Sequence, residues 1–169
     1  MTAARRRDEI LQALAGVSGP VSAAALAARL GVSRQVVVGD VALLRAAGSP
    51  IVATPRGYVL GGGQEGSGVR CTVACRHGLD GLLDELYTVA DCGCGVLDVT
   101  VEHPVYGQLS GQLQVFSRYD ADVFWDALQK NGAQPLCSLT GDIHLHTLVC
   151  PDEARKARVL AALEEKGYL

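Results

Sequence analysis

Two histidines stand two positions apart in the stretch TGDIHLHTLVC, which runs from Thr140 to Cys150. Apolar residues interrupted by polar ones, between a glycine and a proline, predict a short β-strand. Residues i and i+2 of a strand point to the same face, so His144 and His146 are expected to emerge side by side. Imidazole is a common metal ligand, and the pair is a candidate half of a metal site. Strand histidines are also often only hydrogen-bonded or exposed, so the pair alone leaves metal binding open.

Two further residues have types and positions that complete a ligand set. His77 follows an expected strand, and Glu85 lies about two turns into the next expected helix. If the first and fourth strands of a sheet are neighbours, His77, Glu85, His144 and His146 meet at one place. Three imidazoles and a carboxylate suit a divalent transition metal such as nickel, zinc, iron or manganese. The remaining histidine, His103, ends another expected strand, where it could support the metal, contact a ligand or be structural.

The elements that would hold these residues alternate along the second half of the chain. Their order, β-α-β-β-α-β-α, predicts an α+β domain of the split-βαβ, ferredoxin-like kind: one antiparallel sheet with helices on one face. Asp120 is the expected N-cap of the second of its helices. Strands are expected at residues 69–75, 95–103, 107–117 and 140–150, and helices at 79–93, 120–132 and 151–167.

The first half of the chain reads as a different domain. Helices are expected at residues 3–15, 23–30 and 34–48, followed by a hairpin over residues 50–60. Serines stand at the caps of the second and third helices, and a glycine turn separates the two. This is the plan of an all-α winged helix-turn-helix domain, whose third helix enters a DNA groove. The alternative is a helical protein-interaction module with ordinary solvated charges.

Candidate DNA contacts stand where a winged helix needs them. Ser33, Arg34 and Gln35 open the third helix, and they are suitable residue types for phosphate and base-edge contacts. Arg56 is at the tip of the hairpin and would reach the backbone or the minor groove. The run of arginines at residues 5–7 could add phosphate contacts that carry no sequence preference.

Charge and composition divide the chain in the same way. Residues 1–60 carry a net charge of +4 and residues 61–169 a net charge of −7, and the basic half suits a polyanion. The stretch GGGQEGSG, residues 61–68, predicts a flexible linker between domains at 1–60 and 69–169. Without an apolar run long enough to span a membrane or a signal peptide, the protein is expected in the cytoplasm. The six cysteines form no C-x-x-C pair and are expected to be buried as small apolar residues, with a zinc site built from cysteines disfavoured.

Several motifs together carry a resemblance. SRQVVVGDVALLRAAGSPIVATPRGYVL resembles the DNA-binding half of the nicotinate-responsive repressors of NAD biosynthesis. ELYTVADCGCGVLDVTVEHPVYGQL, SRYDADVF and PLCSLTGDIHLHTL resemble their regulatory half, the 3H domain. The resemblance implies a homodimer on double-stranded operator DNA, upstream of genes for NAD synthesis or niacin uptake. It also implies nicotinic acid as corepressor and a divalent metal, nickel or zinc first, on His77, Glu85, His144 and His146.

The effector and its contacts are less sharply indicated. An anionic ligand needs a cationic partner, and Arg118 in SRYD is the candidate, with Tyr106 and His103 as further contacts. The alternative for Arg118 is a surface ion pair with Asp120 or Asp122. Two other functions are considered. A metalloenzyme is disfavoured, because no further acid or base stands in a motif and a hydrolase has no use for a winged helix. A metal-responsive repressor without a niacin effector would have the same DNA-binding half.

Overall fold

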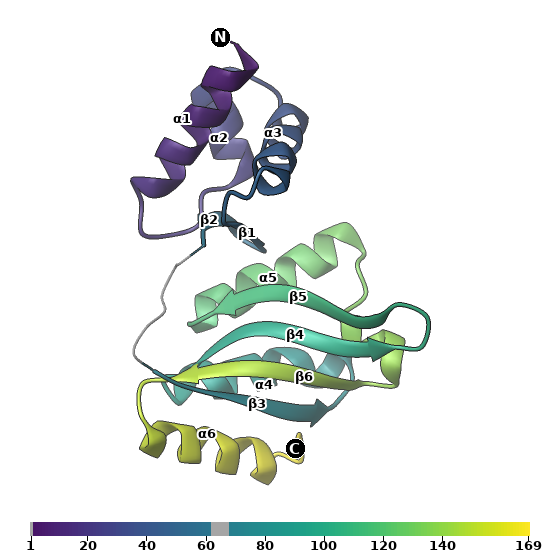
Figure 1. Cartoon of the computed structure of the whole chain (residues 1–169). Helices are drawn as coiled ribbons and strands as arrows, with labels where there is room; N and C mark the ends of the chain where they lie inside the picture. The colour runs from purple at the N-terminus through teal and green to yellow at the C-terminus, as the bar shows by residue number, and fades with distance from the viewer. Residues whose placement is uncertain (1, 62–67) are drawn as a thin grey trace. The chain divides into compact units, whose positions relative to one another are not determined.

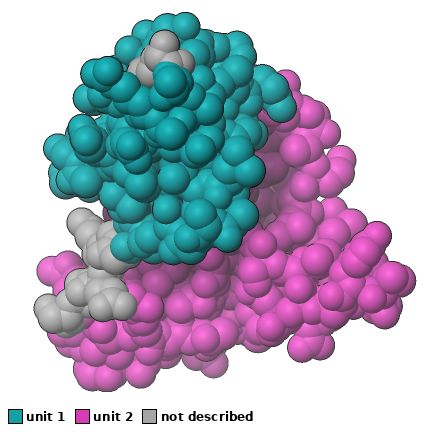
Figure 2. Space-filling model, turned by 45° about the horizontal axis from the view of Figure 1, so that its top comes forward, with its two compact units in different colours: residues 1–65 teal, residues 66–169 magenta. Residues whose placement is uncertain are grey.

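The computed structural model describes residues 2–61 and 68–169 (Figure 1). The chain forms two compact units, Met1–Glu65 and Gly66–Leu169, which Figure 2 distinguishes by colour. Each unit has a hydrophobic core of its own, so each is described by itself. Residues 62–67, most of the predicted linker, lie outside the described residues.

Three helices and a hairpin make up the N-terminal unit. The helices are α1 (Ala3–Ala15), α2 (Ala23–Leu30) and α3 (Arg34–Ala46), and the hairpin pairs β1 (Ile51–Thr54) with β2 (Gly57–Leu60). As predicted, Ser22 and Ser33 cap α2 and α3, each accepting a hydrogen bond from an amide three residues on. Gly31 has φ of 65°, and it allows the tight turn between the two helices. The predicted winged helix-turn-helix fold is confirmed.

The hairpin is tied to the helices by two hydrogen bonds. Val21, just before α2, and Tyr58 in β2 exchange both of their backbone N–H···O bonds, each 2.9 Å long. Apolar residues of all three helices and β1 fill the core behind this bridge: Ile10, Leu14, Leu26, Val37, Val41 and Ile51. The wing is therefore held as part of the unit, and not as a free loop.

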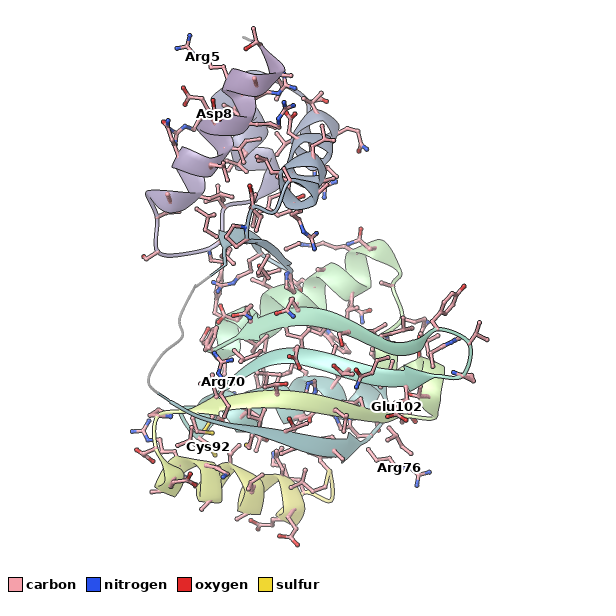
Figure 3. The ribbon with its side chains drawn as sticks, viewed as in Figure 1. Arg5, Asp8, Arg70, Arg76, Cys92 and Glu102 are labelled. Carbon is pink, nitrogen blue, oxygen red and sulfur yellow. The ribbon has the colours of Figure 1, made fainter. Side chains whose placement is uncertain are left out.

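A buried ion pair fastens α1 to α3. The carboxylate of Asp40 is buried and accepts hydrogen bonds from Arg6 Nε at 2.5 Å and Arg6 Nη2 at 3.2 Å. Arg7 Nη1 lies 3.6 Å from the same carboxylate. By contrast, Arg5 points away from the helices (Figure 3). Two of the three arginines considered for phosphate contacts are thus engaged within the protein.

The C-terminal unit is a four-stranded antiparallel sheet with three helices. Its strands are β3 (Val69–Arg76), β4 (Gly95–His103), β5 (Gly107–Val115) and β6 (Ile143–Cys150). They lie in the order β3-β6-β4-β5. Strand β6 separates β3 from β4, so the predicted split-βαβ plan is confirmed, although β3 lies at the edge of the sheet and not inside it as in the ferredoxin order. The helices are α4 (Leu79–Asp91), α5 (Arg118–Asn131) and α6 (Glu153–Glu165), with a 3₁₀ turn, η1 (Leu136–Thr140), before β6.

One face of the sheet carries the core. Helices α4 and α5 lie behind the sheet in Figure 1, and α6 runs along the β3 edge. Their apolar residues pack with the inward-facing residues of the strands, among them Val73, Leu86, Val96, Leu148 and Leu163. Charged residues such as Arg70, Arg76 and Glu102 stand exposed at the ends of β3 and β4 (Figure 3). Within the described ranges, no helix is both long and apolar enough to cross a membrane.

Candidate functional site

The four predicted metal ligands come together on the core face of the C-terminal unit. His77 follows β3, Glu85 lies in α4, and His144 and His146 lie on β6. Strands β3 and β6 are paired neighbours, as the sequence predicted for the first and fourth strands. Because β6 places His144 and His146 on one face, both rings point toward α4, where Glu85 is only 1% exposed.

All three imidazoles direct the same ring nitrogen at one carboxylate oxygen. Glu85 Oε2 lies 2.5 Å from His77 Nε2 and 3.4 Å from the Nε2 atoms of both His144 and His146. The rings also contact one another, with centroids 4.7 Å apart for His77 and His144 and 4.8 Å apart for His144 and His146. The three rings thus converge on one oxygen of Glu85.

The opposite nitrogen of each ring is held by the protein backbone. His77 Nδ1 lies 2.9 Å from Gly78 O, His144 Nδ1 3.0 Å from Asp142 O and His146 Nδ1 2.7 Å from Asp98 O. A carbonyl oxygen only accepts hydrogen bonds, so each Nδ1 must carry a proton and donate it. In the neutral ring, Nε2 then keeps its lone pair for a metal.

Burial and charge shift the pKa values of the cluster in opposite directions. Burial tends to raise the pKa of Glu85, but the hydrogen bonds from the three histidines outweigh it and hold that pKa far below its usual range. Burial tends to lower the pKa values of His77 and His146, yet the adjacent Glu85 carboxylate raises both above the usual value. The metal-free cluster therefore holds protons that a cation would displace.

The donors fit a divalent transition metal. Glu85 Oε1 is buried and accepts no hydrogen bond from any described residue. A buried carboxylate oxygen without a partner is costly unless something positively charged meets it. Three neutral imidazoles with fixed tautomers and one carboxylate suit nickel, zinc, iron or manganese. A mononuclear cation bound by His77, Glu85, His144 and His146 satisfies these constraints together.

Gly81, in α4, lies directly against the side chain of His77. A Cβ added to Gly81 would lie 2.9 Å from both Cβ and Cγ of His77, closer than side chains tolerate. We expect Gly81→Ala to turn the His77 ring away and to weaken Zn²⁺ binding by roughly 10- to 100-fold. This loss is expected even though alanine stabilises a helix by about 1 kcal/mol relative to glycine. Isothermal titration calorimetry measures the loss. Gly111→Ala is the control, because its Cβ would meet Leu136 at an ordinary 3.5 Å; equal affinities in the two variants would contradict the expectation.

A small cavity opens beside the cluster. It measures about 30 Å³, room for one or two water molecules. Its polar wall is made by His77, Glu85, His144 and His146, and the rest is mostly apolar: Leu82, Leu86, Val99, Leu113, Phe124, Pro135, Leu136 and Cys137. Sequence reasoning missed the apolar wall, because its residues come from α4, β4, β5, α5 and the η1 region and share no spacing.

The three effector candidates lie elsewhere. His103 and Tyr106 pack against each other at the β4–β5 turn, with ring centroids 5.0 Å apart, and His103 Nδ1 accepts from the amides of Val105 and Tyr106. Arg118 donates two hydrogen bonds to the carboxylate of Asp91, so it forms a surface ion pair, but with another partner than the expected Asp120 or Asp122. None of the three candidates lines the cavity beside the histidine cluster.

The predicted DNA contacts gather at one end of the N-terminal unit. Ser33, Arg34 and Gln35 are exposed at the start of α3. Arg34 and Arg56 line the same hollow, between the start of α2 and the hairpin. Basic side chains beside two helix N-termini suit the phosphate backbone of DNA.

Known proteins resemble the chain along both units. The family model described as the 3H domain matches residues 70–169, and one described as an HTH domain matches residues 6–59. A probable transcription repressor, NiaR of Thermotoga maritima, is 44% identical over 97% of this chain and 93% of its own length. The transcription repressor NadR of Bacillus subtilis is 40% identical over 98% of this chain and 93% of its own length. The matched ranges thus include the hollow lined by Arg34 and Arg56 and the histidine cluster.

Proposed function

This chain belongs to the family of transcription repressors that join an HTH domain to a 3H domain, and from that premise we propose that it senses nicotinic acid. It is a regulator and not an enzyme, as the sequence predicted. In the proposal, a homodimer binds double-stranded operator DNA at genes of NAD biosynthesis or niacin uptake. Nicotinic acid acts as corepressor, and the C-terminal unit holds a divalent metal on His77, Glu85, His144 and His146. The observation that carries the proposal is the convergence of these four residues beside an apolar cavity.

The two parts of the cavity match the two parts of the effector. A pyridine ring is flat and apolar, and the leucines with Phe124 provide a wall of that kind. A bound metal supplies an electrophile that can accept a pyridine nitrogen or a carboxylate oxygen. The cavity is smaller than a pyridine ring, so its cover must move for the ligand to enter. The segment formed by Pro135, Leu136 and Cys137 is the candidate cover, because it joins α5 to β6 without belonging to the sheet.

The DNA-binding part of the proposal rests on the N-terminal unit. Arg34 and Gln35 would reach the bases and phosphates of one half-site, Ser33 would approach the backbone, and Arg56 would contact DNA from the wing. A dimer places two such units on half-sites about 34 Å apart. Nicotinic acid strengthens repression if it binds better to the dimer form with that spacing, since coupling is reciprocal between two ligands.

Operator binding in the presence of metal tests this coupling. Nicotinic acid should tighten operator binding by about 5- to 150-fold, the usual range for allosteric coupling. Nicotinamide and NAD should not, because neither has the free carboxylate of nicotinic acid. Fluorescence anisotropy with labelled operator DNA, titrated at fixed salt, gives the comparison. Arg34→Ala should lose affinity with and without the effector.

One rival function makes a different prediction in the same titration. The histidine cluster by itself also suits a repressor for which the metal is the signal. In that case metal alone would tighten operator binding and no niacin compound would add to it. An operator affinity that ignores nicotinic acid at every metal concentration would therefore replace the niacin sensor by the metal sensor.

Metal affinity should rise with pH. The pKa values of His77 and His146 are raised in the metal-free protein, so binding must release protons at and above pH 6.5. Below these pKa values each proton displaced makes the affinity about tenfold weaker for every unit of pH lost. Calorimetry at pH 6.5 in buffers of different ionisation enthalpy should detect roughly one to two protons released per Zn²⁺ from His77 and His146, and any further protonated ligand adds to that number. An affinity that is flat between pH 6 and 8 would contradict this account of the cluster.

A further inference from the structure

A thiol stands inside the group of candidate ligands. Cys75, on β3, is the cross-strand partner of His144 on β6, so both side chains rise from the same face of the sheet. Cys75 Sγ, a carboxylate oxygen of Glu85 and a ring nitrogen of His144 all lie within 4.8 Å of one another. Cys75 is 1% exposed, and the group is closed to bulk solvent.

Separations of this size suit ligands of one ion. Zinc lies about 2.3 Å from a thiolate sulfur and about 2.0–2.2 Å from imidazole nitrogen or carboxylate oxygen. Two donors on one cation are therefore at most about 4.5 Å apart. The three atoms lie within 4.8 Å of one another, so a small inward shift lets one cation reach all three. The neighbouring Val73, two residues earlier on β3, faces His146 and has no donor to offer. Among the residues of β3 that face the cluster, the ligand position belongs to Cys75.

The Glu85 carboxylate, which lies beside Cys75, lacks a hydrogen-bond partner within the described ranges for one of its oxygens. Glu85 Oε1 has no hydrogen-bond donor among the described residues, although it is buried. A cation between sulfur and carboxylate would satisfy both groups at once.

We propose that Cys75 is a further ligand of the metal, which makes the centre one of three nitrogens, one oxygen and one sulfur. The inference rests on the proposed metal site. When the metal binds, the S–H bond breaks, sulfur keeps the electron pair for the metal and the proton leaves to solvent. Thiolate is a soft ligand, and it favours zinc, cobalt and nickel over manganese. Cys75 thereby sets which cations the centre accepts.

Cobalt absorption tests the sulfur ligand directly. The full-length, reduced protein is titrated with Co²⁺, whose visible d–d bands report binding and whose near-ultraviolet thiolate charge-transfer band reports sulfur ligation. The wild type should show both. Cys75→Ser should keep the d–d bands and lose the charge-transfer band. Cys137→Ser is the matched control, because Cys137 is also buried and lines the same cavity; it should keep both.

A competition titration gives the effect on selectivity. Cys75→Ser should bind Zn²⁺ at least about tenfold more weakly, with Mn²⁺ affinity changed far less. If serine prevents cooperative folding, Cys75→Ala, which keeps the site apolar, replaces it.

Three results would overturn the inference. If the wild-type protein showed d–d bands and no charge-transfer band, Cys75 would not be a ligand, and the metal site would consist of the histidines and Glu85. A charge-transfer band lost in Cys137→Ser and kept in Cys75→Ser would assign the sulfur ligand to Cys137 in η1 and not to Cys75. Wild-type protein that binds no Co²⁺ at all would overturn this inference together with the metal site.

Discussion

Adding Zn²⁺ to the metal-free protein should raise the Tm of the C-terminal unit by roughly 10 °C. A ligand present at 100 times its Kd stabilises the folded state by about 2.7 kcal/mol, and 1 kcal/mol shifts the Tm of a domain of about 100 residues by roughly 4 °C or more. His146→Ala should abolish this rise, because it removes one of three imidazoles and leaves Glu85 with fewer partners. Trp125, the single tryptophan, lies in α5, so its fluorescence follows the melting of this unit alone.

The histidine that lies outside the cluster, His103, provides the control. His103 lies at the end of β4 and does not line the cavity beside the cluster. His103→Ala should keep the full Zn²⁺-dependent rise in Tm. Each variant is compared with itself, with and without metal, so that a change in metal-free stability cancels. An equal rise in His146→Ala and wild type would show that zinc binds somewhere other than the histidine cluster.

Gly57→Ala should destabilise the N-terminal unit by roughly 3 kcal/mol and weaken operator binding with it. Gly57 has φ of 138°, and an added Cβ would lie 2.4 Å from Val21 O, a backbone atom that cannot rotate away. The strained conformation costs about 1–3 kcal/mol. Moving β2 to relieve the clash also breaks the two hydrogen bonds between Val21 and Tyr58, at about 1 kcal/mol each. Arg56, the preceding residue, would shift with the wing.

A second glycine of the same unit is the matched control. Gly39 lies inside α3, and a Cβ added there meets nothing within 4 Å. Gly39→Ala should stabilise the unit by up to about 1 kcal/mol through helix propensity alone. Denaturant unfolding is followed by circular dichroism, and Trp125 fluorescence separates the transition of the other unit. If Gly57→Ala and Gly39→Ala had the same free energy of unfolding, the close approach of a Cβ at position 57 to the Val21 backbone would not destabilise the unit.

Local sequence patterns predicted the positions of most helices and strands. The N-cap of α5 was predicted wrongly because two nearby side chains could both serve as the cap. The strand at 95–103 and the helix at 3–15 have the predicted bounds, because alternation and caps act within a few residues. The prediction that Asp120 caps α5 is wrong: Ser117 is the cap, and its side chain accepts from the Asp120 amide. The Asp120 carboxylate instead accepts from Phe116 N. The cap at Ser117 starts the helix at Arg118, two residues earlier than predicted.

The candidate site was only partly visible in the sequence. The period of two placed His144 and His146 on one face, but the neighbours of a strand do not follow from its own pattern. The pairing of β3 with β6, which brings His77 to the cluster, was predictable only from the order of all the strands and helices of the unit, and the place of Cys75 in that pairing was not predicted. Arg118 shows the same limit. Its charge suited an anionic ligand, yet only the packing of α5 against α4 reveals that Asp91 is its partner.

The groups that orient the three imidazoles are carbonyl oxygens of Gly78, Asp98 and Asp142, and every amino acid has such an oxygen. A substitution scan would therefore not reveal these three contacts, because no side chain makes them. A substitution at position 78, 98 or 142 keeps the ring tautomers as long as the backbone keeps its conformation, which at Asp142 includes a φ of 70°. Insertions and deletions act differently, because one residue added to β4 would move a carbonyl out of register. We therefore expect the three positions that supply these carbonyls to tolerate substitutions better than insertions or deletions nearby.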